Sequence, residues 1–134
     1  GRTVEHWHTR TKTAKVAILQ HLSPNAWLEM NPRDADTLNL LPHAKVDIVS
    51  RRGRTSGVEL RVTEMVAPGQ VFMPFHFAET NVNEVTQSVF DPFSREPNYK
   101  QCAVRVEKTP PSKATRNRWS FFKKNSPVLE ERRA

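Results

Sequence analysis

Short stretches in which apolar and polar residues alternate dominate the first 107 residues of the chain. Successive side chains of a strand point to opposite faces of a sheet, so this alternation predicts half-buried strands. The alternating stretches are residues 45–51 (KVDIVSR), 58–64 (VELRVTE) and 102–107 (CAVRVE). In the second of them, Val58, Leu60 and Val62 share one face, which we expect to be the buried one.

Two further stretches extend the predicted sheet. The apolar run 71–77 predicts a buried strand that Pro74 interrupts, and residues 14–19 predict another strand. Turns are predicted at 52–54 and at 67–70, where Gly69 suits a positive φ.

One helix is predicted from the signals at its start. Asn31 suits the N-capping position, Pro32 the first helical position, and Asp34 the positively polarised first turn. The apolar positions expected to face inward are Ala35, Leu38 and Leu40. A second short helical turn is predicted near residues 81–87. Several short strands with one or two short helices indicate a mostly-β fold that closes, or nearly closes, into a barrel.

The net charge of +7 is concentrated at the C-terminal end of the chain. Residues 1–107 carry 13 basic and 12 acidic side chains, whereas residues 108–134 carry 8 and 2. We therefore divide the chain into a body, residues 1–108, and a basic tail, residues 109–134, which begins in a proline-rich linker. The tail is expected to be poorly ordered apart from an aromatic anchor at Trp119, Phe121 and Phe122. The nearly neutral body argues against a broadly basic nucleic-acid-binding barrel.

Length and composition narrow the class of protein further. The 134 residues fit one domain, and the single cysteine, Cys102, excludes an internal disulfide and a Cys-rich zinc or iron–sulfur site within this chain. We expect Cys102 to fill the core. No stretch approaches the ~18 consecutive apolar residues of a membrane helix, and no signal segment opens the chain. Because the chain opens with Gly1, directly in a dense polar motif, we expect it to be a piece of a longer polypeptide.

The opening segment, residues 1–13 (GRTVEHWHTRTKT), has the composition of a binding segment. It combines two His, one Trp, four Thr and three basic side chains with few aliphatic residues. Such a set suits a flat, polar, anionic ligand, because hydroxyls bond phosphate oxygens or ring edges, aromatic rings cover ring faces, and basic groups neutralise charge. A solvated, irregular N-terminus is the alternative. A metal site at His6 and His8 is another, but it has no clear third ligand.

A second candidate segment is residues 71–86 (VFMPFHFAETNVNEVT). Its polar part, residues 80–83, directly follows an apolar strand, where a barrel presents side chains at its rim. Asparagine can satisfy both the donor and the acceptor edge of a heterocycle, although it also caps turns and helices. We assign Phe77 to the core and His76 to a hydrogen-bonded structural role.

The third candidate segment is residues 90–102 (FDPFSREPNYKQC). Pro92 and Pro97 predict a rigid, extended loop. Lys100 stands just before the last strand, where it would meet a ligand oxygen or remain solvated. The chain has no glycine-rich phosphate loop, no Ser/His/Asp set and no carboxylate pair, so an independent enzyme is not expected.

Together with residues 24–40 (PNAWLEMNPRDADTLNL), the three segments resemble, in order and spacing, blocks of a known family. They are similar to the molybdopterin dinucleotide-binding domain that closes the large subunit of molybdenum oxidoreductases, and most of all to that of nitrate reductases. The resemblance spans residues 1 to 107. It implies a double-psi β-barrel, a six-stranded closed barrel, and a molybdenum cofactor of the bis(molybdopterin guanine dinucleotide) type.

The resemblance also implies roles for individual residues. The positions that match the family's cofactor contacts are Gly1, Arg2, His6, Trp7, His8, Thr9, Thr11, Asn83 and Lys100. Phe75 matches a position that lines the substrate approach, and Thr13 a nearby position often held by Thr or Ser. The metal-coordinating side chain and the cysteines of a 4Fe-4S cluster would lie in the preceding part of the subunit, which is therefore the implied partner of this domain.

One departure from the family pattern indicates a subtype. Periplasmic relatives typically read HTG[ST]MT, whereas this chain has Arg10 and Lys12 at the Gly and Met positions. This looks closer to the assimilatory type, which is cytoplasmic and reduces nitrate to nitrite. The same domain of a formate dehydrogenase is the nearest alternative, since it shares the fold and the cofactor.

The basic tail allows further interpretations of the function of this chain. A stand-alone module could grip single-stranded nucleic acid through its tail aromatics and basic side chains, an interpretation that the resemblance disfavours. Within a nitrate reductase, the tail would attract an acidic electron donor such as ferredoxin, or an anionic surface, or it would simply be solvated.

Overall fold

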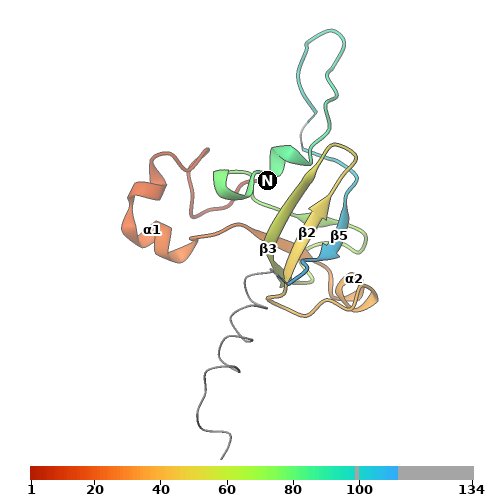
Figure 1. Ribbon diagram of the computed structural model, residues 1–134. Coiled ribbons are helices and arrows are strands. Elements are labelled where there is room, and N and C mark those ends of the chain that lie inside the picture. The colour runs from red at the N-terminus through yellow and green to blue at the C-terminus, as the bar shows by residue number, and fades with distance from the viewer. Residues whose placement is uncertain (99, 112–134) are drawn as a thin grey trace, which may run out of the picture.

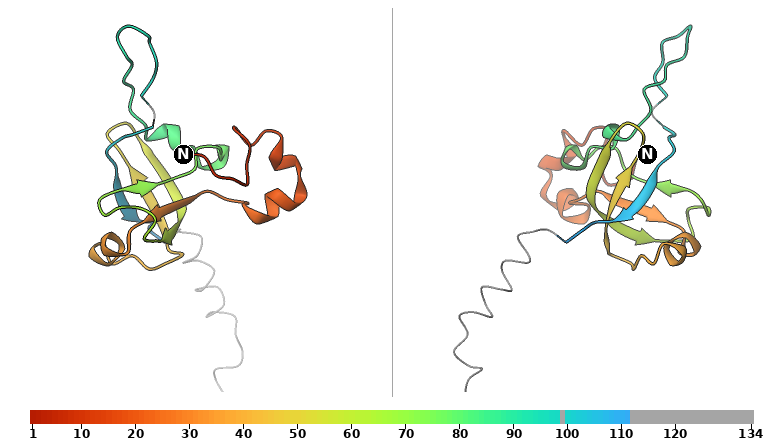
Figure 2. Two further views of the ribbon diagram at one scale, coloured as in Figure 1. Left: turned by 180° about the vertical axis from the view of Figure 1, so that it is seen from behind. Right: turned by 45° about the vertical axis from the view of Figure 1, so that its right-hand side comes forward.

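Strand β3 (Arg54–Val62) lies at the centre of the sheet in this computed structural model, which describes residues 1–98 and 100–111. It pairs in parallel with β1 (Trp27–Met30) and antiparallel with β2 (Lys45–Val49). The edges are β4 (Val71–Phe72) and β5 (Arg105–Lys108), so the strand order is β4-β1-β3-β2-β5. The sheet curls into a half-barrel (Figures 1 and 2).

The predicted alternation is confirmed in the central strand. Val58 and Leu60 are almost fully buried, and Val62 packs against the same core. The core lies on the concave side of the curl and combines residues of the strands and of the segments that follow them. Its largest buried side chains include Leu28, Met30, Leu60 and Phe77. The assignment of Phe77 to the core is therefore confirmed.

The mostly-β fold class is confirmed, but a closed six-stranded barrel is not what the described residues form. They form five strands in an open order, and the two edge strands do not pair with each other. The predicted strand 71–77 ends after Phe72, because Pro74 lacks the N–H group that a ladder needs. The predicted strand 102–107 begins only at Arg105.

The strand predicted at residues 14–19 is wrong. The structure has a 3₁₀ turn, η1 (Thr13–Lys15), followed by helix α1 (Ala17–Leu22), set off to one side of the sheet (Figure 1). Alanine, leucine and glutamine favour helix over strand. The residues Ile18 and Leu22 are 68% and 63% exposed, so their apolar side chains are not buried against the sheet in the described structure.

The helix predicted after Asn31 is confirmed as α2 (Pro32–Thr37). Asn31 caps it, since its Oδ1 accepts a hydrogen bond from the Arg33 backbone N–H at 3.1 Å. Ala35 and Leu40 are buried as predicted, but Leu38 is 47% exposed. The helix ends at Thr37, so Leu38 takes the C-capping position rather than the inward face.

Two 3₁₀ turns follow β4, and the second confirms the predicted short helical turn near residues 81–87. They are η2 (Ala78–Thr80) and η3 (Val82–Glu84), the second capped by Asn81. The Thr55 hydroxyl of β3 donates to the Asn81 carbonyl at 3.0 Å and ties these turns to the sheet. None of the helices in the described part of the chain has the length and apolar composition that a membrane crossing requires.

A buried carboxylate links β2 to β3 and to the residue that follows β5. Asp47 of β2 accepts hydrogen bonds from Arg54 at 2.8 Å, from the Gly57 N–H at 3.1 Å and from the Thr109 hydroxyl at 2.6 Å. Burial by itself would raise the pKa of Asp47, but these donors, with Ser56, lower it below the ordinary 3.8. Thr109, the first residue of the predicted tail, thus contacts the sheet; residues 112–134, with the predicted aromatic anchor, lie outside the described residues.

Replacing Leu60 by Ala should lower the free energy of unfolding by about 3 kcal/mol, because Leu60 is fully buried in the central strand and the truncation leaves a cavity. Urea denaturation measures the change. Leu41→Ala is the matched control, since Leu41 is 75% exposed and its truncation should cost less than about 0.5 kcal/mol. Equal losses in the two variants would contradict the assigned core.

Replacing Asp47 by Asn should destabilise the protein by about 2 kcal/mol at pH 7, because bonds to a charged acceptor are lost. The folded-state pKa of Asp47 is lowered, so its contribution is present above the unfolded pKa, near 3.8, and disappears as pH falls through the lower folded value. Urea denaturation between pH 7 and pH 3 should therefore show the two curves converging below pH 4. A difference that grows on acidification would argue against a stabilised carboxylate.

Candidate functional site

The opening segment, residues 1–13, forms an irregular loop outside the sheet. The Trp7 carbonyl accepts a hydrogen bond from the Arg10 N–H at 2.9 Å and closes a turn. His8 and Arg10 both have positive φ, 46° and 65°. Residues other than glycine adopt this conformation at a cost of about 1–2 kcal/mol, and such strain is concentrated at functional sites. The φ of Arg10 also gives a physical reason why glycine suits this position in the periplasmic pattern.

His6 anchors this loop. The residue is 3% exposed, and both ring nitrogens are bonded: Nε2 to the Ser23 carbonyl at 2.8 Å and Nδ1 to the Thr13 hydroxyl at 3.0 Å. A carbonyl only accepts, so Nε2 carries the proton, and in the neutral ring Nδ1 accepts from Thr13. Thr13 Oγ1 in turn accepts from the Trp7 N–H at 3.3 Å. The His6 ring therefore ties Ser23 to Thr13 and, through the Thr13 hydroxyl, to Trp7.

A metal site at His6 and His8 does not fit this geometry. His6 has no free nitrogen to give a metal ion. Within residues 1–98 and 100–111, no three His, Cys, Asp or Glu side chains gather as a metal-binding group.

A cavity of about 380 Å³ opens along the loop. Its volume lies within the range of small-molecule sites. The lining residues are Arg2, Thr3, Val4, Glu5, His6, Trp7, His8, Thr13 and Leu19. The rings of Trp7 and His8 meet edge to face at 4.6 Å, and the buried Thr3 hydroxyl has no hydrogen-bond partner. The cavity thus offers ring surfaces, one guanidinium and one carboxylate.

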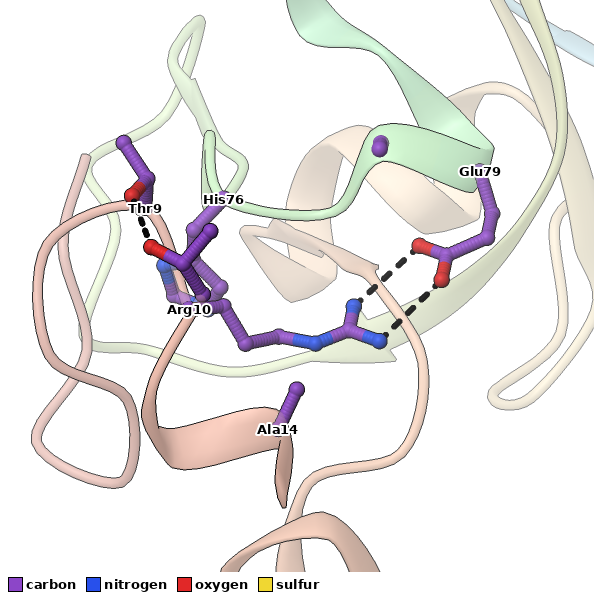
Figure 3. A pocket seen from close by; sticks show the side chains of 7 residues that line it. Thr9, Arg10, Ala14, His76 and Glu79 are labelled. Atoms are coloured by element: carbon purple, nitrogen blue, oxygen red, sulfur yellow. Dashed lines mark hydrogen bonds and ion pairs between the residues drawn. The ribbon is translucent and has the colours of Figure 1, made fainter.

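A second cavity, of about 150 Å³, adjoins the next part of the loop (Figure 3). The residues that line it are Thr9, Arg10, Thr11, Ala14, His76, Ala78 and Glu79. Arg10 turns inward, with its side chain only 11% exposed, and donates two hydrogen bonds of 3.1 Å to the Glu79 carboxylate. Its guanidinium also lies 4.6 Å from the centre of the Phe77 ring. Arg10 therefore fastens the opening loop to η2.

His76 does not have the hydrogen-bonded structural role predicted for it. The residue is 5% exposed, yet neither ring nitrogen has a hydrogen-bond partner within the described structure. Burial, and after it the electrostatic effect of nearby His6 and Arg10, lowers the pKa of His76 below its ordinary 6.5. The sequence next to His76 is apolar, which is why a satisfied core histidine was expected.

The two cavities bring together six of the nine predicted cofactor contacts. Four line the larger cavity and two, Thr9 and Thr11, the smaller one. Gly1 lies beside Phe75, whose N–H donates to the Gly1 carbonyl at 3.1 Å. Asn83 and Lys100 are exposed and line neither cavity.

Sequence reasoning missed Thr3, His76 and the pairing of Arg10 with Glu79. The ion pair joins residues 69 positions apart, and no local pattern reveals such a contact. The one usable signal was the polar run at residues 80–83 directly after an apolar strand, which predicted a rim but not its partner.

Comparisons with known proteins identify a family and a similar fold. Residues 1–103 match the family described as "Molydopterin dinucleotide binding domain". The fold is similar to that of acetylene hydratase from Pelobacter acetylenicus, with a TM-score of 0.70 at 16% sequence identity. That match covers 81% of this chain but only 17% of the hydratase chain, so the shared fold is a small part of the larger enzyme. Because the family match covers most of the sequence, this chain belongs to the molybdopterin dinucleotide-binding domain family.

Proposed function

We propose that this chain is the C-terminal cofactor-binding domain of an assimilatory, cytoplasmic molybdenum nitrate reductase. In this proposal it holds a bis(molybdopterin guanine dinucleotide) cofactor and walls part of the active site. The observation that carries cofactor binding is the 380 Å³ cavity, which is lined by Arg2, Trp7 and His8 of the opening loop. The nitrate assignment rests on the sequence resemblance and on Arg10 and Lys12 within it.

The side chains of the larger cavity fit the chemistry of a pterin dinucleotide. Arg2 can balance phosphate charge, and Trp7 and His8 offer ring faces for stacking. The Glu5 carboxylate suits the amino and ring N–H donors of a pterin or a guanine.

The predicted contacts divide into two roles. The exposed side chains of Trp7, His8 and Arg2 are placed to touch the ligand directly. His6 acts as a positioning residue, because both of its nitrogens already hold the loop. Thr9 and Thr11 face the smaller cavity. Gly1, Asn83 and Lys100 are proposed as contacts from the family resemblance.

When bound, the molybdenum cofactor supplies the two-electron chemistry that removes an oxygen from nitrate. The domain's own part is to bind and orient it, through side chains held in place before the ligand arrives. Phe75, proposed to line the substrate approach, is half-buried and fixed next to Gly1 by a backbone hydrogen bond.

The remainder of the subunit is the proposed partner, and it would carry the 4Fe-4S cluster. Large apolar side chains are exposed on the opening loop, on α1 and on the arm at 89–98: Val4, Trp7, Ile18, Leu22, Phe90 and Phe93. The arm projects from the sheet (Figures 1 and 2), and Phe93 is 94% exposed. Exposed apolar surface of this extent is typical of an interaction face. A contact between the basic tail and an acidic donor such as ferredoxin is a further part of the proposal.

The full-length polypeptide that carries this domain tests the function. Purified protein should contain molybdenum and a pterin that becomes fluorescent after release and oxidation, and it should reduce nitrate with an artificial electron donor. Trp7→Ala should weaken cofactor retention by roughly five- to 150-fold, since one stacking contact contributes about 1–3 kcal/mol. Met65→Ala, at an exposed residue outside both cavities, is the control. A protein without molybdenum, or one that oxidises formate and leaves nitrate untouched, would refute the assignment.

The positioning role of His6 predicts an effect at Thr13. Thr13→Val keeps the shape but removes the hydroxyl that bonds both His6 and the Trp7 N–H. Cofactor content per protein should fall, and the unfolding free energy should drop by about 1–2 kcal/mol. Thr13→Ser keeps the hydroxyl and should restore both properties. A Val variant that retains full cofactor content would show that this network does not position the loop.

A further inference from the structure

Arg10 is a residue of the opening loop to which the proposed contacts give no part. In the sequence it lies between Trp7 and His8, which line the larger cavity, and Thr11, which lines the smaller one. Its backbone is bonded on both sides: the Arg10 N–H donates to the Trp7 carbonyl at 2.9 Å, and the Arg10 carbonyl accepts from the Ala14 N–H at 2.9 Å. The conformation of Arg10 therefore determines how the two halves of the loop lie relative to each other.

This conformation is strained, and the side chain of Arg10 is what keeps it. At a φ of 65°, a residue with a Cβ atom is disfavoured relative to glycine, so a released Arg10 would turn toward negative φ and break the bond to Trp7. The guanidinium opposes this change. It donates to both carboxylate oxygens of Glu79 at 3.1 Å (Figure 3) and lies 4.6 Å from the centre of the buried Phe77 ring.

The ion pair between Arg10 and Glu79 has a geometry that restrains the loop. The Arg10 side chain is only 11% exposed, although that of Glu79 is 68% exposed. Two bonds from one planar guanidinium to one carboxylate fix direction as well as distance, which a single bond from an ammonium group would not. Glu79 belongs to η2, which directly follows the core residue Phe77, so the pair fixes the loop to a segment anchored in the core.

We propose that Arg10 and Glu79 form a positioning pair, which holds Trp7 and His8 in the arrangement that lines the larger cavity. Arg10 does not touch the ligand in this proposal, because it acts through the turn that its N–H group closes with Trp7. Glu79, which the family resemblance did not single out, becomes part of the site through this pair. The effect on cofactor binding rests on the proposed function, whereas the effect on the loop does not.

Two substitutions of Arg10 in the full-length polypeptide separate positioning from direct contact. Arg10→Ala removes the pair but keeps the strain of a Cβ atom at positive φ, so the cofactor should dissociate about tenfold faster. Arg10→Gly removes the pair and the strain together, and the dissociation rate should rise by only about threefold. If Arg10 touched the cofactor, both variants would lose the same contact and would release the cofactor equally fast.

A double-mutant cycle tests the partner. Glu79→Ala should have the same effect as Arg10→Ala, and the double variant should be no worse than either single one, since both substitutions remove one interaction. Glu107→Ala is the matched control. It removes ion pairs with Arg54 and Arg105 at the edge of the sheet, away from both cavities, and should leave the cofactor dissociation rate unchanged.

Hydrogen exchange measures the loop directly, in full-length polypeptide made in cells that cannot synthesise the cofactor. In Arg10→Ala and in Glu79→Ala, residues 7–14 should exchange about fivefold faster than in the wild type, while β3 should keep its protection. Equal dissociation rates for the Ala and Gly variants, wild-type retention in Glu79→Ala, or unchanged exchange would each overturn the positioning pair. Wild-type polypeptide that binds no cofactor would instead refute the proposed function, and the exchange measurement would still decide whether the pair positions the loop.

Discussion

Two hydrogen bonds on the ring of His6 determine how the opening loop lies, and the candidate site depends on that loop. The loop has few aliphatic side chains, so burial of apolar surface cannot hold it against the sheet. A buried imidazole that bonds Ser23 on one side and Thr13 on the other replaces that driving force with directed contacts. Its cost is the desolvation of a polar ring, which is acceptable because both nitrogens are satisfied.

The same rule of satisfied partners applies to two charged side chains, Asp47 and Arg10. Asp47 is buried among donors from β3 and from Thr109, and these lower its pKa despite its burial. Arg10 is drawn under the loop only because Glu79 meets its guanidinium and Phe77 lies beneath it. His76 does not follow this rule, and neither do the Thr3 and Ser23 hydroxyls and the Gln20 side-chain oxygen, which are also buried without a partner in the described structure. Of these residues, His76 and Thr3 line cavities.

The sheet forms the apolar core, whereas the segments outside the sheet line the cavities. The curled sheet is an ordinary apolar core built from alternating strands, and it carries none of the cavity chemistry itself. Chain segments that leave the sheet, the opening loop and the turns after β4, carry the polar side chains. This division suits a domain that holds a cofactor while a larger polypeptide covers its exposed apolar faces.

Much of the sheet could be predicted from the sequence, because local patterns carry that information. The alternation around Val58 and Leu60, the capping of α2 by Asn31 and the turn at Gly69 each depend on residues within a few positions of one another. Where such patterns were weak, prediction was wrong. Residues 14–19 form a helical turn and α1 rather than a strand, because their apolar side chains find no sheet to join.

What the sequence by itself determined is the composition of the site: a loop rich in Thr, His and Trp whose residue types suit a flat, polar, anionic ligand. What only the tertiary structure decided is the use of each side chain. His6 and His8 are two positions apart, yet one is a buried anchor and the other lines a cavity with an exposed ring. That difference arises from partners such as Ser23, and from Glu79 in the case of Arg10, which lie far along the chain and meet the loop only after folding.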